Sequence, residues 1–141
     1  YYASNEMKEN GGSIVNLASI NGLVGYNKGI NSKLKGINPY PHSKGGVIQL
    51  TKDMAVGFAE LKIRVNALCP GVVETDMTRA GFAVNGDEAE GIRLQHDAYP
   101  LKRIGTLEEA AAATLFLASE EAGFINGVAL PMEGGATVGK W

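Results

Sequence analysis

The sequence predicts an α/β protein built on a parallel sheet with flanking helices. Three short runs rich in Val, Ile and Leu show little alternation between apolar and polar residues, which is typical of strands buried on both faces of a parallel sheet. Longer stretches with helical periodicity separate these runs, so strands and helices alternate along the chain. With 141 residues, of which 45% are hydrophobic, the chain is expected to form one domain with a real core.

Each predicted strand has its own signal. The chain opens on what reads as the polar end of a helix, and Gly11-Gly12 is a natural helix stop. Apolar runs at residues 14–17, 63–68 and 128–130 predict the three strands. Because the chain opens on the end of an element, we expect that a preceding segment belongs to the fold.

Two helices are predicted between the strands. In the first, an apolar face recurs at spacings of three and four residues, through Val47, Leu50, Met54, Phe58 and Leu61. In the second, Thr106 and Glu109 have the spacing of a capping box ahead of an Ala-rich run that ends at Ser119.

Two segments fit no regular element well. Residues 27–38 are rich in Gly, Asn and Lys and are expected to form a loop, and residues 76–105 show only weak helical character near 87–96. Long connections beyond the strand ends of α/β proteins often carry ligand contacts, so residues 76–105 are the expected substrate loop. Its apolar side chains either line a pocket or pack in the interior: Phe82, Val84, Ile92, Leu94 and Tyr99.

Composition and charge limit the function classes. The net charge of −2 gives no electrostatic reason to expect nucleic acid or an anionic membrane as partner, and no apolar stretch approaches the ~20 residues of a membrane span. We therefore expect a small-molecule substrate, and no cluster of residues suggests a metal site. Cys69 is the only cysteine, which makes a reducing, cytoplasmic setting the default, and we expect it to be a small buried residue rather than a nucleophile.

Ser19, Tyr40 and Lys44 form the candidate catalytic group. Tyr40 and Lys44 are four residues apart at the start of the first predicted helix, which puts both side chains on one face. A free tyrosine has a pKa of about 10 and is a poor acid or base at neutral pH, but a neighbouring ammonium favours the phenolate. Ser19 follows the first predicted strand, where a parallel sheet faces its ligands, so its hydroxyl is suited to hold a substrate oxygen. By itself, this Tyr/Lys spacing also occurs in solvated pairs without a function.

A Pro-Gly bend follows the second predicted strand. Pro70 and Gly71 either simply end the strand or bend the backbone so that Val73 and Thr75 approach a flat amide ligand. Together with this bend, the order of motifs resembles the classical short-chain dehydrogenase/reductase family from about residue 12 to residue 135. The motifs are S-I-N-G at 19–22, Y-P-H-S-K-G-G at 40–46, I-R-V-N-A-L-C-P-G-V-V-E-T-D-M at 63–77, R-I-G-T-L-E-E-A at 103–110 and N-G-V-A-L-P-M-E-G-G at 126–135.

The resemblance implies a reaction and a role for each catalytic candidate. Ser19 matches the serine that polarises the substrate oxygen, and Tyr40 matches the general acid/base. Lys44 matches the lysine that activates this tyrosine and binds the nicotinamide ribose. The implied reaction is the interconversion of an alcohol and a ketone or aldehyde by hydride transfer to or from NAD or NADP.

The resemblance also implies how the coenzyme binds and which part of the fold is present. Tyr40 and Lys44 match coenzyme contacts, and Val73 and Thr75, after the Pro70-Gly71 bend, match the residues that contact the nicotinamide carboxamide. No glycine-rich turn between a strand and a helix is found for the pyrophosphate. We therefore expect residues 1–141 to be the C-terminal part of one Rossmann-like NAD(P)-binding domain, with the N-terminal half of the doubly wound fold absent. The family resemblance further implies a homotetramer.

Two other functions remain open. The chain is either this oxidoreductase or a non-catalytic fragment or subunit that acts only with a partner chain. A sugar epimerase or dehydratase with the same Tyr/Lys pair is less favoured, because the Pro-Gly bend followed by Thr75 resembles the reductases.

Overall fold

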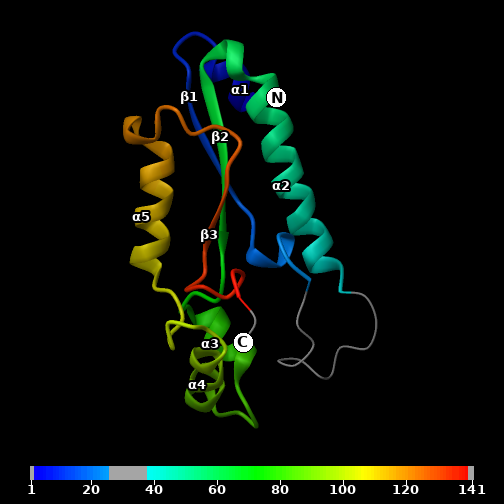
Figure 1. Ribbon diagram of the computed structural model, residues 1–141, viewed down its shortest axis with the longest axis vertical. Helices are drawn as coiled ribbons and strands as arrows, with labels where there is room; N and C mark the ends of the chain where they lie inside the picture. Colours follow the sequence, from blue (N-terminus) through cyan, green and yellow to red (C-terminus); the bar gives the residue numbers. More distant parts are fainter. Residues whose placement is uncertain (1, 26–37, 140–141) are drawn as a thin grey trace.

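The computed structural model describes residues 2–25 and 38–139. These residues form three layers, with a parallel sheet between helices (Figure 1). Strands β1 (Gly12–Leu17), β2 (Ile63–Pro70) and β3 (Ala129–Met132) are hydrogen-bonded in the order β1-β2-β3. Both neighbouring pairs are parallel, with Gly12 opposite Ile63 in the first pair. The α/β fold predicted from the sequence is therefore confirmed, and each strand lies close to its expected position.

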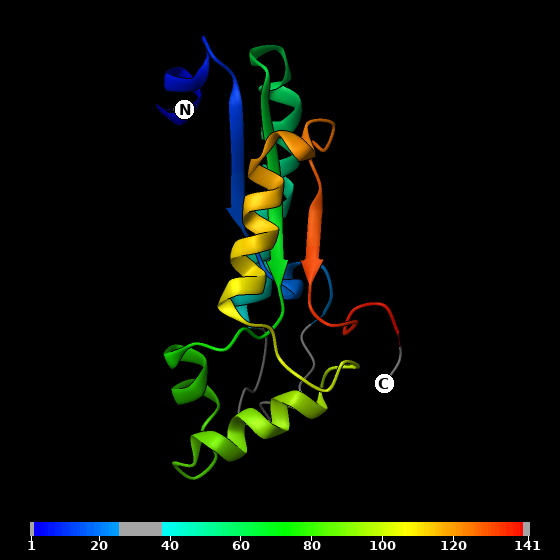
Figure 2. The same ribbon diagram turned by 90° about the vertical axis from the view of Figure 1, so that its left-hand side faces the viewer.

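Helices cover both faces of the sheet. α2 (Pro39–Gly57) lies on one face and α5 (Leu107–Ala118) on the other, so the sheet stands between them in both views (Figures 1 and 2). All strands point toward one end of the molecule, and α3 (Asp76–Phe82) and α4 (Glu88–Asp97) lie beyond their carboxyl ends (Figure 2). The N-terminal helix α1 (Tyr2–Met7) lies at the opposite end, near the start of β1.

Local sequence explains where the long helices begin. Asn38 Oδ1 accepts a hydrogen bond of 2.9 Å from Tyr40 N and so caps α2, while Pro39 stands first in the helix, where its missing N–H costs nothing. The predicted capping box of α5 is present, since Thr106 Oγ1 accepts from Glu109 N (3.2 Å) and the Glu109 carboxylate accepts from Thr106 N (2.9 Å). The described residues also contain single turns of 3₁₀ helix, namely η1 (Ile20–Gly22), η2 (Ala59–Leu61) and η3 (Glu120–Ala122).

The predicted apolar face of α2 packs on the sheet at Val47, Met54, Phe58 and Leu61, and it differs from the prediction at one position. Leu50, expected in the core, is 53% exposed, whereas Ile48, Thr51 and Ala55 are buried. One of the buried positions is held by a polar residue, Thr51. Thr51 Oγ1 donates to a backbone carbonyl one turn earlier (2.8 Å) and accepts from Asn16 Nδ2 (2.9 Å), so its hydroxyl is satisfied inside the protein. A pattern built from apolar residues alone passes over such a position.

The interior is made of small clusters. Two of them join α2 to the sheet, one formed by Ala18, Ile48, Ala67 and Cys69 and the other by Ala55, Ile63 and Val65. Within residues 76–105, Ile92 and Tyr99 pack with Ile104 in a third cluster, while Val84 and Leu94 are exposed. This segment was expected to be only weakly helical, but it holds two helices and a small core of its own. The expected apolar side chains therefore do not line one common pocket.

Two polar side chains of β2, one buried and one half-buried, tie this central strand to α5 and to the segment before β3. Asn66, which is fully buried, donates from Nδ2 to the Ile125 carbonyl (2.9 Å) and accepts from Val128 N (3.0 Å). Arg64 donates to the carbonyl oxygen of Leu117 near the end of α5 (2.9 Å). In the two described ranges, no buried side-chain nitrogen or oxygen lacks a hydrogen-bond partner. The buried polar side chains of the scaffold that positions the strand ends are therefore satisfied.

Candidate active site

Ser19 lies just beyond the carboxyl end of β1, as predicted, and is 6% exposed. Its Oγ accepts a hydrogen bond of 3.2 Å from Asn21 N and so caps the turn η1. Because the hydroxyl is the acceptor in this bond, its own proton can serve another oxygen. The strand end thus holds a fixed hydroxyl that is able to donate to a ligand.

Tyr40 and Lys44 lie in the first turns of α2, as their spacing predicts. Lys44 Nζ lies 5.8 Å from the centroid of the Tyr40 ring, and it donates a hydrogen bond of 2.9 Å to the carbonyl oxygen of Leu17, the last residue of β1. The ammonium therefore links the start of α2 to the end of β1. The Tyr40 side chain is 45% exposed, so a ligand can reach it from outside.

A glycine lets the turn that carries Ser19 pack on the helix that carries Lys44. Gly22 in η1 lies against the backbone of Lys44 and Gly45, with no room for a side chain.

Cys69 is fully buried, and burial raises the pKa of its thiol, while a hydrogen bond from the backbone of Ser19 and the charge of Lys44 partly oppose this rise. Both residues are thus neighbours of Cys69, which is a packing residue, as predicted, and not an activated thiolate.

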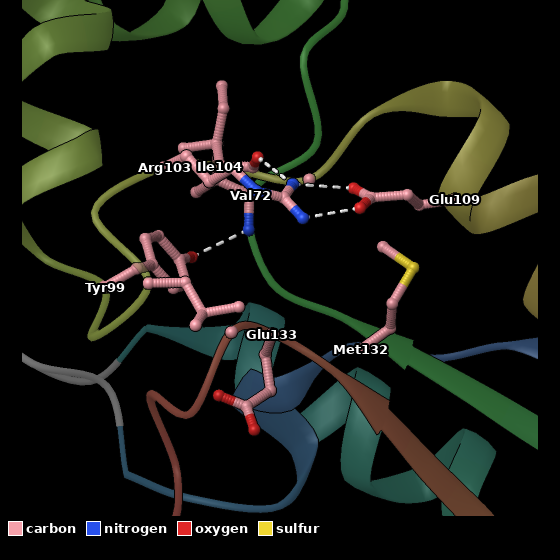
Figure 3. Close-up of a pocket in the computed structure, with 10 residues that line it drawn as sticks. Val72, Tyr99, Arg103, Ile104, Glu109, Met132 and Glu133 are labelled. Carbon is pink, nitrogen blue, oxygen red and sulfur yellow. Dashed lines mark hydrogen bonds and ion pairs between the residues drawn. The ribbon is translucent and has the colours of Figure 1, made fainter.

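The Pro70-Gly71 bend is held by Tyr99, which the sequence did not assign to the site. Tyr99 Oη accepts a hydrogen bond of 2.7 Å from Val72 N (Figure 3). A Cβ atom on Gly71 would lie 2.9 Å from the same Oη, so the close approach of the ring requires glycine. Burial raises the pKa of Tyr99, the bond from Val72 opposes the rise, and the charge of Glu133 adds to it. The phenol therefore stays protonated at neutral pH.

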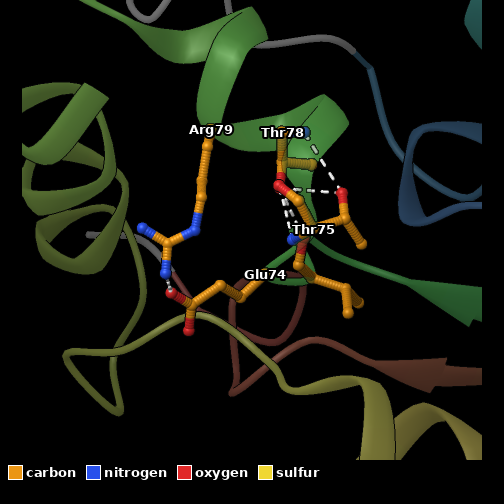
Figure 4. Close-up of polar contacts among 5 residues, drawn as sticks. Glu74, Thr75, Thr78 and Arg79 are labelled. Carbon is orange, nitrogen blue, oxygen red and sulfur yellow. Dashed lines mark hydrogen bonds and ion pairs between the residues drawn. The ribbon is translucent and has the colours of Figure 1, made fainter. Parts of the chain in front are cut away.

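Val73 and Thr75 lie where β2 passes into α3. Thr75 Oγ1 accepts from Thr78 N (3.1 Å), and Thr78 Oγ1 accepts from Thr75 N (2.9 Å) (Figure 4). This reciprocal pair is a capping box with Thr in place of the usual Glu or Gln, which explains why α3 was not predicted. The backbone of Val73 also bridges to Gly105, so the segment is anchored to the far end of the 76–105 connection.

A pocket of about 200 Å³ lies beside the bend (Figure 3), and Ser19, Tyr40 and Lys44 do not line it. In it, the Arg103 guanidinium donates two hydrogen bonds to Glu109, of 2.9 and 2.6 Å. These bonds, together with one from the backbone of the capping box, lower the pKa of Glu109 to about 2. In the sequence, only the capping box indicates this pair. The positive charge of Arg103 and the negative charge of Glu109 already neutralise each other.

The predicted site residues therefore form two groups at the carboxyl ends of the strands. Ser19, Tyr40 and Lys44 belong to the contact between η1 and α2, and Val73 and Thr75 belong to the connection from β2 to α3. The predicted loop at 27–38 lies, except for Asn38, outside the described residues. Among residues 2–25 and 38–139, no group of three or more His, Cys, Asp or Glu side chains could hold a metal ion. No helix in the described part of the chain has the length and apolar character needed to cross a membrane.

Sequence comparison shows clear relatives. The family model described as enoyl-(acyl carrier protein) reductase matches residues 1–137. The 2-(R)-hydroxypropyl-CoM dehydrogenase of Xanthobacter autotrophicus is 42% identical over 126 residues, which are 89% of this chain and 46% of that protein. The chain spans about half the length of the curated relatives it matches.

Solved structures agree with the sequence comparison. A short chain dehydrogenase family protein from Francisella tularensis matches with a TM-score of 0.78 and 32% identity, over 90% of this chain and 51% of that chain. A gluconate 5-dehydrogenase from Burkholderia cenocepacia, solved in complex with NADP and tartrate, matches with a TM-score of 0.76 and 31% identity, over 98% of this chain and 49% of that chain. The order of strands, the helices on both faces and these relatives agree, and the chain belongs to the short-chain dehydrogenase/reductase family.

Proposed function

We propose that this chain carries the catalytic residues of an NAD- or NADP-dependent oxidoreductase that interconverts an alcohol and a ketone or aldehyde. The observation that carries the proposal is the position of Lys44, whose ammonium lies 5.8 Å from the centre of the Tyr40 ring and bonds the end of β1, close in sequence to Ser19. A phenol, an ammonium and a buried hydroxyl at one helix–strand junction suit proton transfer to a bound oxygen.

In this proposal, two side chains act on the substrate oxygen and a third acts on the tyrosine. Ser19 Oγ donates a hydrogen bond to that oxygen and holds it in place. In oxidation, Tyr40 Oη takes the proton of the alcohol, and in reduction it returns that proton to the new alcohol oxygen. The Lys44 ammonium stabilises the Tyr40 phenolate, which is the form that takes the proton in oxidation and the form that remains after the proton is given up in reduction. The nicotinamide, when bound, supplies the hydride acceptor or donor.

The segment beyond the bend fits a nicotinamide carboxamide. Gly71 lets the backbone turn closely, and the Val73 backbone and the Thr75 hydroxyl offer hydrogen-bond donors and acceptors to a flat amide. Tyr40 and Lys44 are the proposed contacts to the ribose on the same side. These contacts concern only the nicotinamide end, which NAD and NADP share. The similarity to a gluconate 5-dehydrogenase solved with NADP supports a dinucleotide at this place.

Other parts of the proposal rest on the family. Residues 76–105 act as the substrate loop, and the substrate is a small alcohol or carbonyl compound, in line with the dehydrogenase names of the relatives. The protein is proposed to be a homotetramer. Its single cysteine agrees with a cytoplasmic location.

The alternative is a non-catalytic fragment or subunit that acts only with a partner chain. The observation in its favour is that the chain spans about half the length of its curated relatives. Coenzyme binding separates the two functions, because only the oxidoreductase must bind a nicotinamide.

The test uses the protein purified at its natural length. NADH and NADPH are titrated by fluorescence, and a panel of small alcohols and ketones is assayed with the coenzyme that binds. Tyr40→Phe is expected to lower kcat between about 10²- and 10⁴-fold while coenzyme binding persists. Tyr2→Phe, at an 85% exposed position, is the matched control and should leave kcat unchanged. Binding of neither coenzyme would overturn the proposal and favour the alternative.

A further inference from the structure

One hydroxyl group lies at the centre of the hydrogen bonds that shape residues 73–75. Thr78 Oγ1 donates to the carbonyl oxygen of Val73 at 2.8 Å and accepts from Thr75 N at 2.9 Å (Figure 4). It also lies 3.0 Å from Thr75 Oγ1 and 2.9 Å from Thr75 O. A single side chain therefore touches both of the residues proposed to contact the carboxamide.

The contact with Val73 is more than helix capping requires. A capping box needs only two bonds, from Thr78 N to Thr75 Oγ1 and from Thr75 N to Thr78 Oγ1. The bond to Val73 O reaches outside α3, to the residue that follows the bend at the end of β2. It thus adds nothing to the cap, and its effect is to fix the direction of the Val73 carbonyl.

A count of protons assigns the donor between the two hydroxyls. Thr78 Oγ1 has one proton, and two carbonyl oxygens, of Val73 and Thr75, lie within 2.9 Å of it. When Thr78 Oγ1 donates this proton to one of the carbonyl oxygens, it has none left for Thr75. Thr75 Oγ1 is therefore the donor in the 3.0 Å contact between the two hydroxyls. The Thr75 proton is therefore held on Thr78 Oγ1, and Thr75 can turn it to a carbonyl oxygen of a ligand without losing the bond from Thr78 N.

Glu74, between the two residues, is held separately. Its backbone N donates to Gly105 O at 2.9 Å, and its carboxylate pairs with Arg79, away from Thr78 (Figure 4). The middle of the segment is thus fixed by Gly105 and its two ends by Thr78. Loss of the Thr78 hydroxyl is expected to free the ends and leave the middle in place.

We propose that Thr78 is a positioning residue for the coenzyme, which holds the Val73 carbonyl and the Thr75 hydroxyl in the geometry that binds a primary carboxamide. The inference rests on the proposed function, because it takes the ligand of this segment to be a nicotinamide. Thr78 acts only through Val73 and Thr75, so its effect is confined to the nicotinamide end of the coenzyme.

ADP-ribose tests this restriction, since it contains the rest of the coenzyme but lacks nicotinamide; for an NADP-specific protein the 2′-phosphate form replaces it. Thr78→Val keeps the shape of the side chain and removes the hydroxyl. In the natural-length protein, it is expected to weaken coenzyme binding roughly tenfold, the effect of about one hydrogen bond, and to leave ADP-ribose binding unchanged. Thr78→Ser restores the hydroxyl and should bind the coenzyme like the wild type. Thr114→Val removes an exposed helix hydroxyl on α5 and is the remote control.

The outcomes separate this inference from the proposed function. Wild-type protein that binds neither coenzyme means that the proposed function is wrong. If the wild type binds coenzyme but Thr78→Val loses coenzyme affinity and ADP-ribose affinity equally, Thr78 only supports the fold. If the coenzyme affinity of Thr78→Val is unchanged, Thr78 does not position the coenzyme. If circular dichroism shows that Thr78→Val does not fold, Thr78→Cys compared with Thr78→Ser gives the same test, because the thiol is a weak donor.

Discussion

A Cβ atom on Gly22 would lie 2.6 Å from the carbonyl carbon of Lys44 and 2.8 Å from the backbone nitrogen of Gly45. Real side chains do not tolerate such distances, so η1 rests on α2 with backbone against backbone. Ser19 caps η1, and Lys44 projects from α2. Glycine at position 22 therefore sets how closely the serine and the lysine approach each other.

Gly22→Ala is expected to push η1 away from α2. The shift should lower kcat between about 10- and 100-fold, because small displacements in a catalytic group are costly, and should destabilise the fold by about 1–3 kcal/mol. Steady-state kinetics and urea unfolding measure the two effects. Gly46→Ala is the matched control, since a Cβ there meets nothing within 4 Å, and it should stabilise α2 by about 0.5–1 kcal/mol with kcat unchanged. Wild-type kcat in Gly22→Ala would show that this packing does not position Ser19.

Tyr99→Phe is expected to loosen the Pro70-Gly71 bend. The substitution keeps the ring that packs on Gly71 but removes the acceptor of the Val72 N–H. The half-buried Val72 N–H then lacks its partner, at a cost of about 1 kcal/mol, which a urea unfolding curve will resolve. An unchanged unfolding midpoint would mean that water replaces the phenol as acceptor.

The same tyrosine gives a pH dependence in alkali. Burial raises the folded-state pKa of Tyr99 above its ordinary value of 10.0, so the folded protein holds this proton more tightly than the unfolded chain does. The resulting stability is fully present below about pH 10 and is lost as the pH rises through the folded-state pKa. Unfolding free energies measured from about pH 9 to 11 should fall more steeply for the wild type than for Tyr99→Phe. Parallel curves would contradict this role.

The Arg103–Glu109 pair gives a pH dependence in acid. The hydrogen bonds from Arg103 lower the folded-state pKa of Glu109 to about 2, below its ordinary 4.5. The carboxylate therefore stabilises the fold above about pH 4.5, and this contribution is lost as the pH falls toward 2. Glu109→Gln keeps an acceptor for Thr106 N but removes the charge, so its stability should depend less on pH in this range. Because the pair is exposed, added salt should shrink the difference, and Glu121→Gln on η3 serves as the control.

Thr51→Val is expected to destabilise the contact between α2 and β1. Valine has the shape of threonine, but it leaves the Asn16 amide without its acceptor, at a cost of about 1–3 kcal/mol in unfolding free energy. The double variant Asn16→Leu/Thr51→Val removes both partners and should recover part of that loss. Additive losses in the double variant would show that the two side chains do not depend on each other.

The strands and the first helix were predictable because their signals are local. Asn38 and Pro39 mark the start of α2, and the largely apolar sequence of β2 marks a strand buried on both faces. In contrast, Thr51 takes a core position that apolar periodicity cannot show, because its hydroxyl is matched by Asn16 of β1. Helix α3 escaped prediction because its seven residues carry no apolar period and its cap uses Thr78.

The candidate site was predictable only in part. The spacing of Tyr40 and Lys44 placed both at the start of a helix, and the strand end placed Ser19 at the turn η1, which packs on that helix. The contributions of Gly22 and Tyr99 depend on contacts across the fold, with Lys44 and Val72, that no local pattern reports. The roles of Gly22 and Tyr99 can be assigned only when the relative positions of the packed elements are known.

Every strand pair in the described sheet is parallel, which bears on how the chain folds. Gly12 and its partner Ile63 are roughly 50 residues apart in sequence, so the entropy of closing a long loop must be lost before any strand contact forms. The capped helices α2 and α5 can begin from local sequence, whereas the sheet has no hairpin from which to start. Refolding should therefore be slow for a chain of this size. Ser19 and Lys44 both belong to the segment between β1 and β2, so pairing of these two strands fixes both ends of the segment that carries the proposed catalytic residues.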